Sequence, residues 1–235
     1  MNVLFNADDF GLTKGVTDGI MQAHLNGVVG STTLMMNGWA VDYAVEKAKE
    51  FPSLRVGIHL VLTWGRPICS DIPELVDTEG LFKYKNTFME MDPPDVSAVE
   101  KEWRAQIEAF LKTGLPLHHI DSHHHIHGWA PLKDVVIKLA KEFGVRVRYV
   151  DSLKAYPDIL LTEKLWLDFY ESGVNAGILD ELYKLDVQSV EVMTHPAVVD
   201  DDLQKVSTYL EERAQELKIL CSLERHGGTG PASHL

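Results

Sequence analysis

The stretch that most constrains this sequence is His118–His127, HHIDSHHHIH, which holds six of the eleven histidines of the chain. The apolar residues just before it, 115–117, together with Ile120, indicate a short buried strand that ends as the histidines begin. Neutral imidazole is the commonest protein ligand for transition metals, so this density predicts a metal site at the carboxyl end of a strand. The alternatives are a polar loop of hydrogen-bonded histidines and an expression tag. The tag is excluded because the run is internal and is interrupted by Asp, Ser and Ile.

If these residues form a strand, the direction of each side chain can be predicted. Side chains along an extended strand alternate between its two faces. The alternation predicts two sets, with Asp121, His123, His125 and His127 on one face and Ser122 and His124 on the other.

The length of 235 residues fits one large domain, which α/β barrels commonly need, or two small ones. The chain contains no internal repeat, low-complexity linker or break in composition. We therefore expect a single domain over residues 1–235, with a frayed end from His226 to Leu235, where the sequence is polar and rich in glycine.

The net charge of −13, from 22 basic and 35 acidic residues, argues against nucleic acid or an anionic membrane as a partner. A neutral or cationic small ligand suits this charge better. Cys69 and Cys221 form no CxxC pair, so neither a disulfide framework nor a zinc knuckle is expected. No apolar stretch approaches the roughly 18 residues of a membrane span, and the first residues do not resemble a signal peptide. These features predict a cytoplasmic protein.

Predicted strands and helices alternate along the chain. The sequence predicts strands over 3–5, 31–36, 54–60, the residues before the histidine cluster, 145–150, 189–193 and 219–221. It predicts helices after Thr13 and over 40–51, 96–113, 132–143, 163–170, 179–184 and 203–217. Such alternation is typical of a parallel sheet covered by helices. The segment 62–96 has no clear period and holds four of the ten prolines, which is typical of a lid or binding loop.

Residues able to bind metal or carry protons follow four separate predicted strands. They are Asp8 and Asp9, His59, the 118–127 cluster, and His195. In parallel α/β folds, sites assemble at the carboxyl ends of the strands. A closed or nearly closed barrel brings four such ends together more easily than an open sheet. We therefore expect a TIM-like (β/α) barrel, with an incomplete or distorted barrel included.

The residue types indicate hydrolysis. One Asp and two His leave coordination positions open, as in a metal site that activates water. A second carboxylate beside the ligand can take the proton of that water, and a histidine at another strand end can protonate a leaving group, which suits an amide or ester substrate. The sequence has no GxSxG, Walker loop or GxGxxG, so covalent acyl-enzyme and nucleotide chemistry have little support.

Four motifs resemble the YdjC-type carbohydrate deacetylases, which include chitooligosaccharide deacetylases acting on chitobiose and its phosphate. The motifs are NADDFG at 6–11, GIHLVLT at 57–63, HIDSHHHIH at 119–127 and MTHP at 193–196. They occur in family order over roughly the first 200 residues, and jointly they are specific although each alone is weak.

The resemblance implies a distorted TIM-like barrel, one divalent metal ion, and removal of an N-acetyl group from sugars containing N-acetylglucosamine, as in chitin degradation. By motif position, the metal ligands would be Asp9, His59 and His123, the base Asp8, and the acid His195. Magnesium and zinc are favoured, while manganese, cobalt and nickel stay open. The substrate would be a small carbohydrate whose length and phosphorylation are open. The oligomeric state is open too, with a homodimer among the alternatives.

Five further residues have weaker assignments. Asp121 could orient a ligand histidine or bond to nearby backbone, and His125 could support the site from behind. Trp64 and Trp129 could stack on a sugar ring or be packed aromatics. Arg148 could meet a carboxylate or a substrate phosphate, or lie at the surface.

Two rival functions use the same residues. The first is another metal-dependent hydrolase such as a phosphoesterase, whose sites usually hold two metals and more basic residues. The second is a non-enzymatic module that binds metal or sugar. The presence of Asp8 and His195 beside the three candidate ligands argues against the second.

Overall fold

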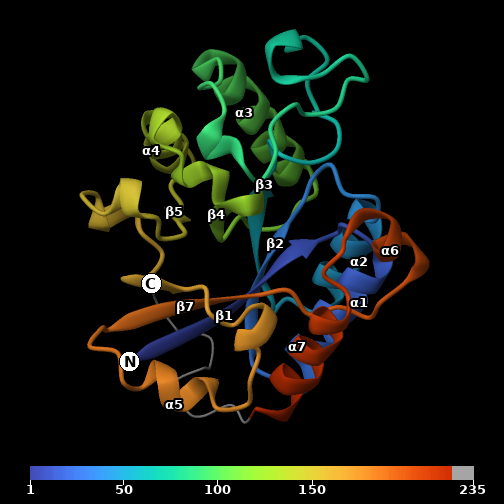
Figure 1. The fold of residues 1–235 in the computed structure, drawn as a ribbon, viewed down its shortest axis with the longest axis vertical. Coiled ribbons are helices and arrows are strands. Elements are labelled where there is room, and N and C mark those ends of the chain that lie inside the picture. The colour runs from blue at the N-terminus through green and yellow to red at the C-terminus, as the bar shows by residue number, and fades with distance from the viewer. Residues whose placement is uncertain (224–235) are drawn as a thin grey trace.

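The computed structural model describes residues 1–223 and contains a seven-stranded sheet in the order β5-β4-β3-β2-β1-β7-β6 (Figure 1). The strands are β1 Asn2–Phe10, β2 Val29–Leu34, β3 Arg55–Leu60, β4 His119–Ser122, β5 Arg146–Val147, β6 Lys164–Trp166 and β7 Ser189–Thr194. Every neighbouring pair is parallel. A parallel sheet directs the carboxyl ends of all its strands to one edge, and this edge carries the candidate site.

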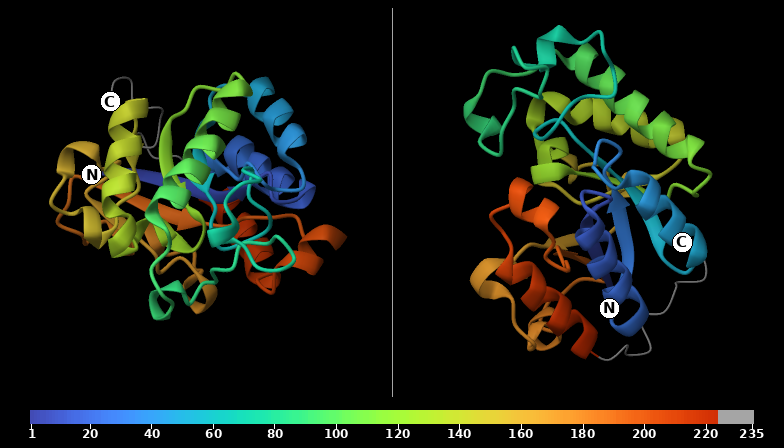
Figure 2. Two further views of the ribbon diagram at one scale, coloured as in Figure 1. Left: turned by 90° about the horizontal axis from the view of Figure 1, so that it is seen from above. Right: turned by 90° about the vertical axis from the view of Figure 1, so that its right-hand side faces the viewer.

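Helices cover the outside of the sheet (Figure 2). They are α1 Lys14–Asn26, α2 Val41–Glu50, α3 Val96–Lys112, α4 Lys133–Phe143, α5 Ile178–Leu182, α6 Asp201–Val206 and α7 Glu211–Ser222. Helix α1 contacts both α2 and α7, and α3 contacts α4. Local sequence sets where helices begin: the Thr13 side chain accepts a hydrogen bond from the Val16 amide at the start of α1, and Asp95 does the same for Ala98 at the start of α3.

The sheet curls until its two edges approach each other. Val147 in β5 pairs on its free side with Leu160, and only a few residues later β6 begins beside β7, the opposite edge. Arg148, directly after β5, reaches Glu191 in β7 at 2.7 Å. These contacts confirm the expected α/β fold as an incomplete, distorted barrel.

The inside of the curl is polar. The Ser31 hydroxyl donates to Asn6 at 2.6 Å, Asn6 donates to Asp8 at 2.9 Å, and the Thr33 hydroxyl donates to Asp121 at 2.9 Å. Asn6 lies between Phe5 and Ala7 along β1, and Asp121 follows Ile120 in β4; these apolar neighbours belong to the hydrophobic core. The barrel interior is therefore a hydrogen-bonded platform below the candidate site.

The C-terminal third differs from the sequence prediction. The helix expected over 163–170 is wrong, because Lys164–Trp166 form edge strand β6. The single helix over 203–217 and the strand over 219–221 are also wrong, because α6 ends at Val206 and α7 continues through Ser222. The physical reason is that the buried residues of α7 are Arg213, Glu216 and Leu220, so its inner face is mostly charged and shows no apolar period.

The extent of one predicted strand also changes. Strand β5 covers only Arg146–Val147 of the predicted 145–150. The segment 62–96 contains two short 3₁₀ turns. The first part of this segment is held against α3, because the buried carboxylate of Glu102 accepts hydrogen bonds from the backbone amides of Ile68 and Cys69. The predicted frayed end lies outside the described residues, and none of the helices in residues 1–223 has the length and apolar character needed to cross a membrane.

Candidate active site

Asp8 and Asp9 stand at a bulge near the end of β1. The register between β1 and β2 shifts between Ala7 and Phe10, and Asp9 has a left-handed backbone with φ of 67°. In a regular strand two consecutive side chains face opposite sides of the sheet. Here both carboxylates line the same cavity, because the bulge turns Asp9 back toward the side of Asp8.

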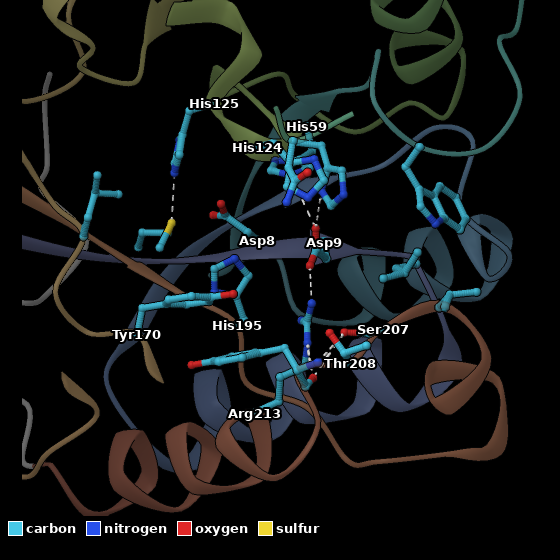
Figure 3. A pocket seen from close by; sticks show the side chains of 18 residues that line it. Asp8, Asp9, His59, His124, His125, Tyr170, His195, Ser207, Thr208 and Arg213 are labelled. Atoms are coloured by element: carbon cyan, nitrogen blue, oxygen red, sulfur yellow. Dashed lines mark hydrogen bonds and ion pairs between the residues drawn. The ribbon is translucent and has the colours of Figure 1, made fainter. Parts of the chain in front are cut away.

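This cavity has a volume of about 500 Å³ and lies at the carboxyl ends of the strands (Figure 3). It brings together most of the predicted site residues, namely Asp8, Asp9, His59, Trp64, His123, His125 and His195. In Figure 3, His59 and His124 lie on one side of Asp9, and Arg213 extends from α7 toward its other side.

Asp9 forms the centre of a group of possible metal ligands. Its Oδ1 lies 3.4 Å from His59 Nε2 and 3.1 Å from His123 Nδ1, and one ligand atom from each residue lies within 4.8 Å of the others. His59 Nδ1 is hydrogen-bonded to Asp121 at 2.7 Å, which directs Nε2 toward Asp9. A histidine held from behind by a carboxylate is typical of metal sites, so one Asp and two His here fit a divalent cation.

Burial opposes a charge on His59, but the ion pair and hydrogen bond with Asp121 raise the pKa of this ring to about 10. The proton on Nε2 must therefore leave before this nitrogen can bind a metal.

The three consecutive histidines point in different directions. Strand β4 ends at Ser122, and a 3₁₀ turn follows in which His124 and His125 have left-handed φ values of 54° and 55°. The predicted alternation of faces across 121–127 is therefore wrong. His123 faces Asp9, His124 Nδ1 lies 3.0 Å from the Thr63 hydroxyl, and His125 Nε2 lies 3.2 Å from Met193 Sδ. His125 thus lines the cavity without contacting the Asp9 group.

Asp8 is held by Arg148 through two hydrogen bonds of 2.6 Å. Although burial opposes ionisation, the Arg148 guanidinium holds the pKa of Asp8 well below its usual range. Arg148 also pairs with Asp121 at 2.9 Å and with Glu191 at 2.7 Å. Its side chain is fully buried and is not among those that line the cavity, so the surface alternative is wrong and the carboxylate alternative describes its contacts.

Helix α7 contributes a second set of buried charges that the sequence reasoning missed. Arg213 donates to Asp9 Oδ2 at 2.6 Å. Glu216 accepts the backbone amide of His195 and, at 2.7 Å, the hydroxyl of Tyr209. Burial raises the pKa of Glu216 to about 8. An Arg and a Glu three residues apart on a helix are usually an exposed ion pair, and that pattern gives no signal that both face inward.

His195 lies between Asp8 and a pair of tyrosines. Burial and the nearby Arg213 lower the pKa of this ring to about 4, so it is neutral at pH 7. Tyr170 and Tyr209 stack on each other with ring centroids 4.4 Å apart, and both meet the His195 ring edge-on. The tyrosines therefore fix the orientation of the imidazole and exclude water from one side of it.

The two candidate sugar-stacking tryptophans differ. Trp64 lines the cavity. Trp129 is only 7% exposed, packs against Tyr84 and Phe88, and is not among the cavity side chains, so the packed-aromatic alternative describes it.

The class of this protein is therefore an α/β barrel with a group of possible metal ligands, one Asp and two His, at the carboxyl ends of its strands. The family model described as YdjC-like protein matches residues 2–226, and the chain belongs to this family.

Relatives of known name cover nearly the whole chain. A protein of Oceanobacillus iheyensis named carbohydrate deacetylase is 61% identical over 95% of this chain and 97% of its own. A protein of the same name from Brevibacillus brevis is 42% identical, over 95% and 92%. A crystal structure of a proposed cellobiose-phosphate cleavage protein from Enterococcus faecalis V583 is 35% identical, with a TM-score of 0.87, and covers 93% of this chain and 90% of its own.

Proposed function

We propose that this protein is a metal-dependent carbohydrate deacetylase that hydrolyses the N-acetyl group of sugars containing N-acetylglucosamine. The observation that carries the proposal is the convergence of Asp9, His59 and His123 beside Asp8 and His195 in one cavity. The relatives named carbohydrate deacetylase support removal of an acetyl group from a carbohydrate.

Asp9, His59 and His123 would hold one divalent ion, with magnesium and zinc the favoured identities. Such an ion supplies Lewis acidity toward the acetyl carbonyl and lowers the pKa of water. Two further groups of possible ligands contain Asp8 and Asp121, or Asp121 and Glu191. All three of these carboxylates already pair with Arg148, so the guanidinium is the cation there and we expect one metal ion per chain.

Asp8 would act as the base. The Arg148 ion pair keeps its carboxylate ionised across the physiological pH range. Arg148 and Asn6 together also fix the orientation of this carboxylate, so little conformational entropy is lost when it accepts a proton from the attacking water.

His195 would protonate the sugar nitrogen as the C–N bond breaks. Because the ring is neutral at pH 7, it would first take up the proton that Asp8 accepts from water and then donate it to the nitrogen. The hydrolysis then balances: water supplies the hydroxyl group of the acetic acid and the proton that the departing amine gains.

For the substrate, we propose chitobiose, other short chitooligosaccharides or their phosphates. A cavity of about 500 Å³ fits a small sugar, and the chain charge of −13 favours an uncharged ligand over a polyanion. The Enterococcus faecalis protein is named for a phosphorylated disaccharide, which supports including chitobiose phosphate among the candidate substrates.

The test is acetate release from N-acetylglucosamine, chitobiose and chitobiose phosphate, with and without chelator. We expect release from at least one sugar, loss on chelation, and recovery when magnesium or zinc is added. No acetate from any N-acetylated sugar would contradict the proposal, and two metal ions per chain would favour a phosphoesterase.

A further inference from the structure

A second tryptophan lies just outside the cavity. Trp39 sits in the turn between β2 and α2, and 55% of its surface is exposed. Its ring centroid lies 6.1 Å from that of Trp64, with the planes inclined by 50°. Trp64 lines the cavity and Trp39 does not, so the two indoles form a continuous aromatic surface from the cavity wall outward.

The turn that carries Trp39 is fixed to the strand end that carries the aspartates. The Trp39 amide donates to the Leu12 carbonyl and the Ala40 amide to the Gly11 carbonyl, each at 2.9 Å. Gly38 packs so closely on Gly11 that a Cβ atom would lie 2.2 Å from the Gly11 oxygen. Backbone hydrogen bonds therefore hold Trp39 to Leu12, which is the third residue after Asp9 in the chain.

Trp64 is tied to the same turn. The side-chain amide of Asn37 donates to the carbonyl of Trp64 at 3.0 Å and to that of Arg66 at 3.1 Å. One residue thus sets the spacing of the two segments that carry the indoles. A large apolar side chain that is rigidly mounted yet left exposed beside a cavity is typical of a ligand-binding groove.

We propose that Trp39 is an outer carbohydrate subsite, where a further ring of an oligosaccharide stacks while the N-acetylated ring occupies the cavity. This inference rests on the proposed function and adds a direction for the sugar chain, outward over Trp64 and Trp39. A pyranose ring has an apolar C–H face and a polar rim. The indole of Trp39 can cover that face while the hydroxyl groups stay in water, so the contact requires no further polar partner.

A second cavity offers a rival route. It has a volume of about 960 Å³ and shares Asn86, His124, His125 and Leu167 with the first. Its wall carries charges of both signs, including Glu163 and Lys164. We favour the tryptophan route because an exposed indole can stack on an uncharged sugar without desolvating any charge.

The test compares Trp39→Ala and Trp39→Phe with wild type on β-linked N-acetylglucosamine oligomers of one, two and three rings. We expect Trp39→Ala to raise KM for the longer oligomers by about three- to tenfold, with kcat unchanged and the single ring unaffected. Trp39→Phe should restore part of the loss. Tyr183→Ala is the matched control, because Tyr183 is 56% exposed and lines neither cavity.

Several outcomes would overturn the subsite. They are an equal change for all three lengths, no change for any length, and a shift in molecular mass by light scattering in Trp39→Ala. A length-dependent KM effect of Leu165→Ala, in the second cavity, with none at Trp39 would also overturn it and assign the rival route.

A calorimetric titration separates this inference from the proposed function. The three-ring sugar is titrated into the Asp8→Asn protein with and without Trp39→Ala. Weaker binding without Trp39 supports the subsite even if wild type releases no acetate, whereas acetate release with equal binding rejects the subsite alone.

Discussion

The cavity is built from two halves, each of which places an arginine on an aspartate. In the strand half, Arg148 binds Asp8 and also pairs with Asp121 and Glu191, all of them buried. In the helix half, Asp9 is the only carboxylate of residues 1–223 that forms an ion pair with Arg213 of α7. The guanidinium of Arg148 thus belongs to a closed network, while that of Arg213 lines the cavity.

This difference suggests a division of tasks between two adjacent carboxylates. Asp8 has both oxygens engaged by one rigid partner, which suits a fixed proton acceptor. Oδ1 of Asp9 faces His59 and His123, whereas Arg213 binds only Oδ2. This arrangement suits a metal ligand, because Oδ1 is not bound by the arginine and points toward the two other candidate ligands.

The sharpest test of this division is Asp8→Asn beside Asp9→Asn. Removing the base should lower kcat by about 10²- to 10⁴-fold while metal content stays normal, because Asp8 is outside the Asp9 group. Asp9→Asn should instead lower metal content, and Asn tolerates the left-handed backbone at this position. Acetate release and elemental analysis measure the two effects, and near-normal turnover of Asp8→Asn would remove it as the base.

The two arginines should differ in their effect on the free energy of unfolding. Arg148→Met leaves three buried carboxylates without their cation and should cost about 3–5 kcal/mol. Arg213→Met leaves only one carboxylate, that of Asp9, without its arginine, so a smaller loss is expected. Urea denaturation of both variants measures this, and equal losses would mean that the two halves are energetically alike.

Substitutions of different histidines in the 118–127 cluster should differ in their effect on metal affinity. His123→Ala removes one of three candidate ligands, so metal affinity should fall by at least about 100-fold, more than is typical for residues that only support a ligand. His125→Ala is the matched control, because its ring faces Met193. Titration of metal into chelated protein measures both. Loss of metal in His125→Ala alone would reverse the assignment.

The smallest effect, when measured per pH unit, concerns the stability contribution of Glu216 in the helix half. Its pKa is about 8 in the folded protein, above the usual value of 4.5, so the folded state binds the extra proton between these limits. Stability from this group is therefore lost as pH rises toward 8, at up to about 1.4 kcal/mol per pH unit. Glu216→Gln should flatten this part of the stability–pH profile, as measured by urea denaturation from pH 5 to 8. An unchanged slope would show that Glu216 is ionised throughout.

The same two halves explain what the sequence could and could not predict. The strand half was predictable because its polar residues come shortly after predicted strands, as Asp8 follows the strand over 3–5 and His195 follows the strand over 189–193. The parallel order of the strands then places them at one edge. The choice of His123 among the three consecutive histidines came from the family resemblance, because the alternation of side chains along a strand did not distinguish His123 from His125.

The helix half was not predictable because its inward-facing residues are charged. Apolar periodicity locates the buried side of a helix only when that side is apolar, and α7 buries Arg213 and Glu216. The left-handed turn at His124 and His125 was equally hidden, since neither Gly nor Asn marks it. In each case long-range contacts determine the local structure.

The bulge at Asp8 and Asp9 has a consequence for how this site can change. Its extra residue, rather than the chemistry of either side chain, is what brings two neighbouring carboxylates to one side. The two residues between Ala7 and Phe10 are the aspartates themselves, so deleting either one would remove the bulge together with one carboxylate. The site therefore depends on the number of residues at this point as strictly as on their chemistry.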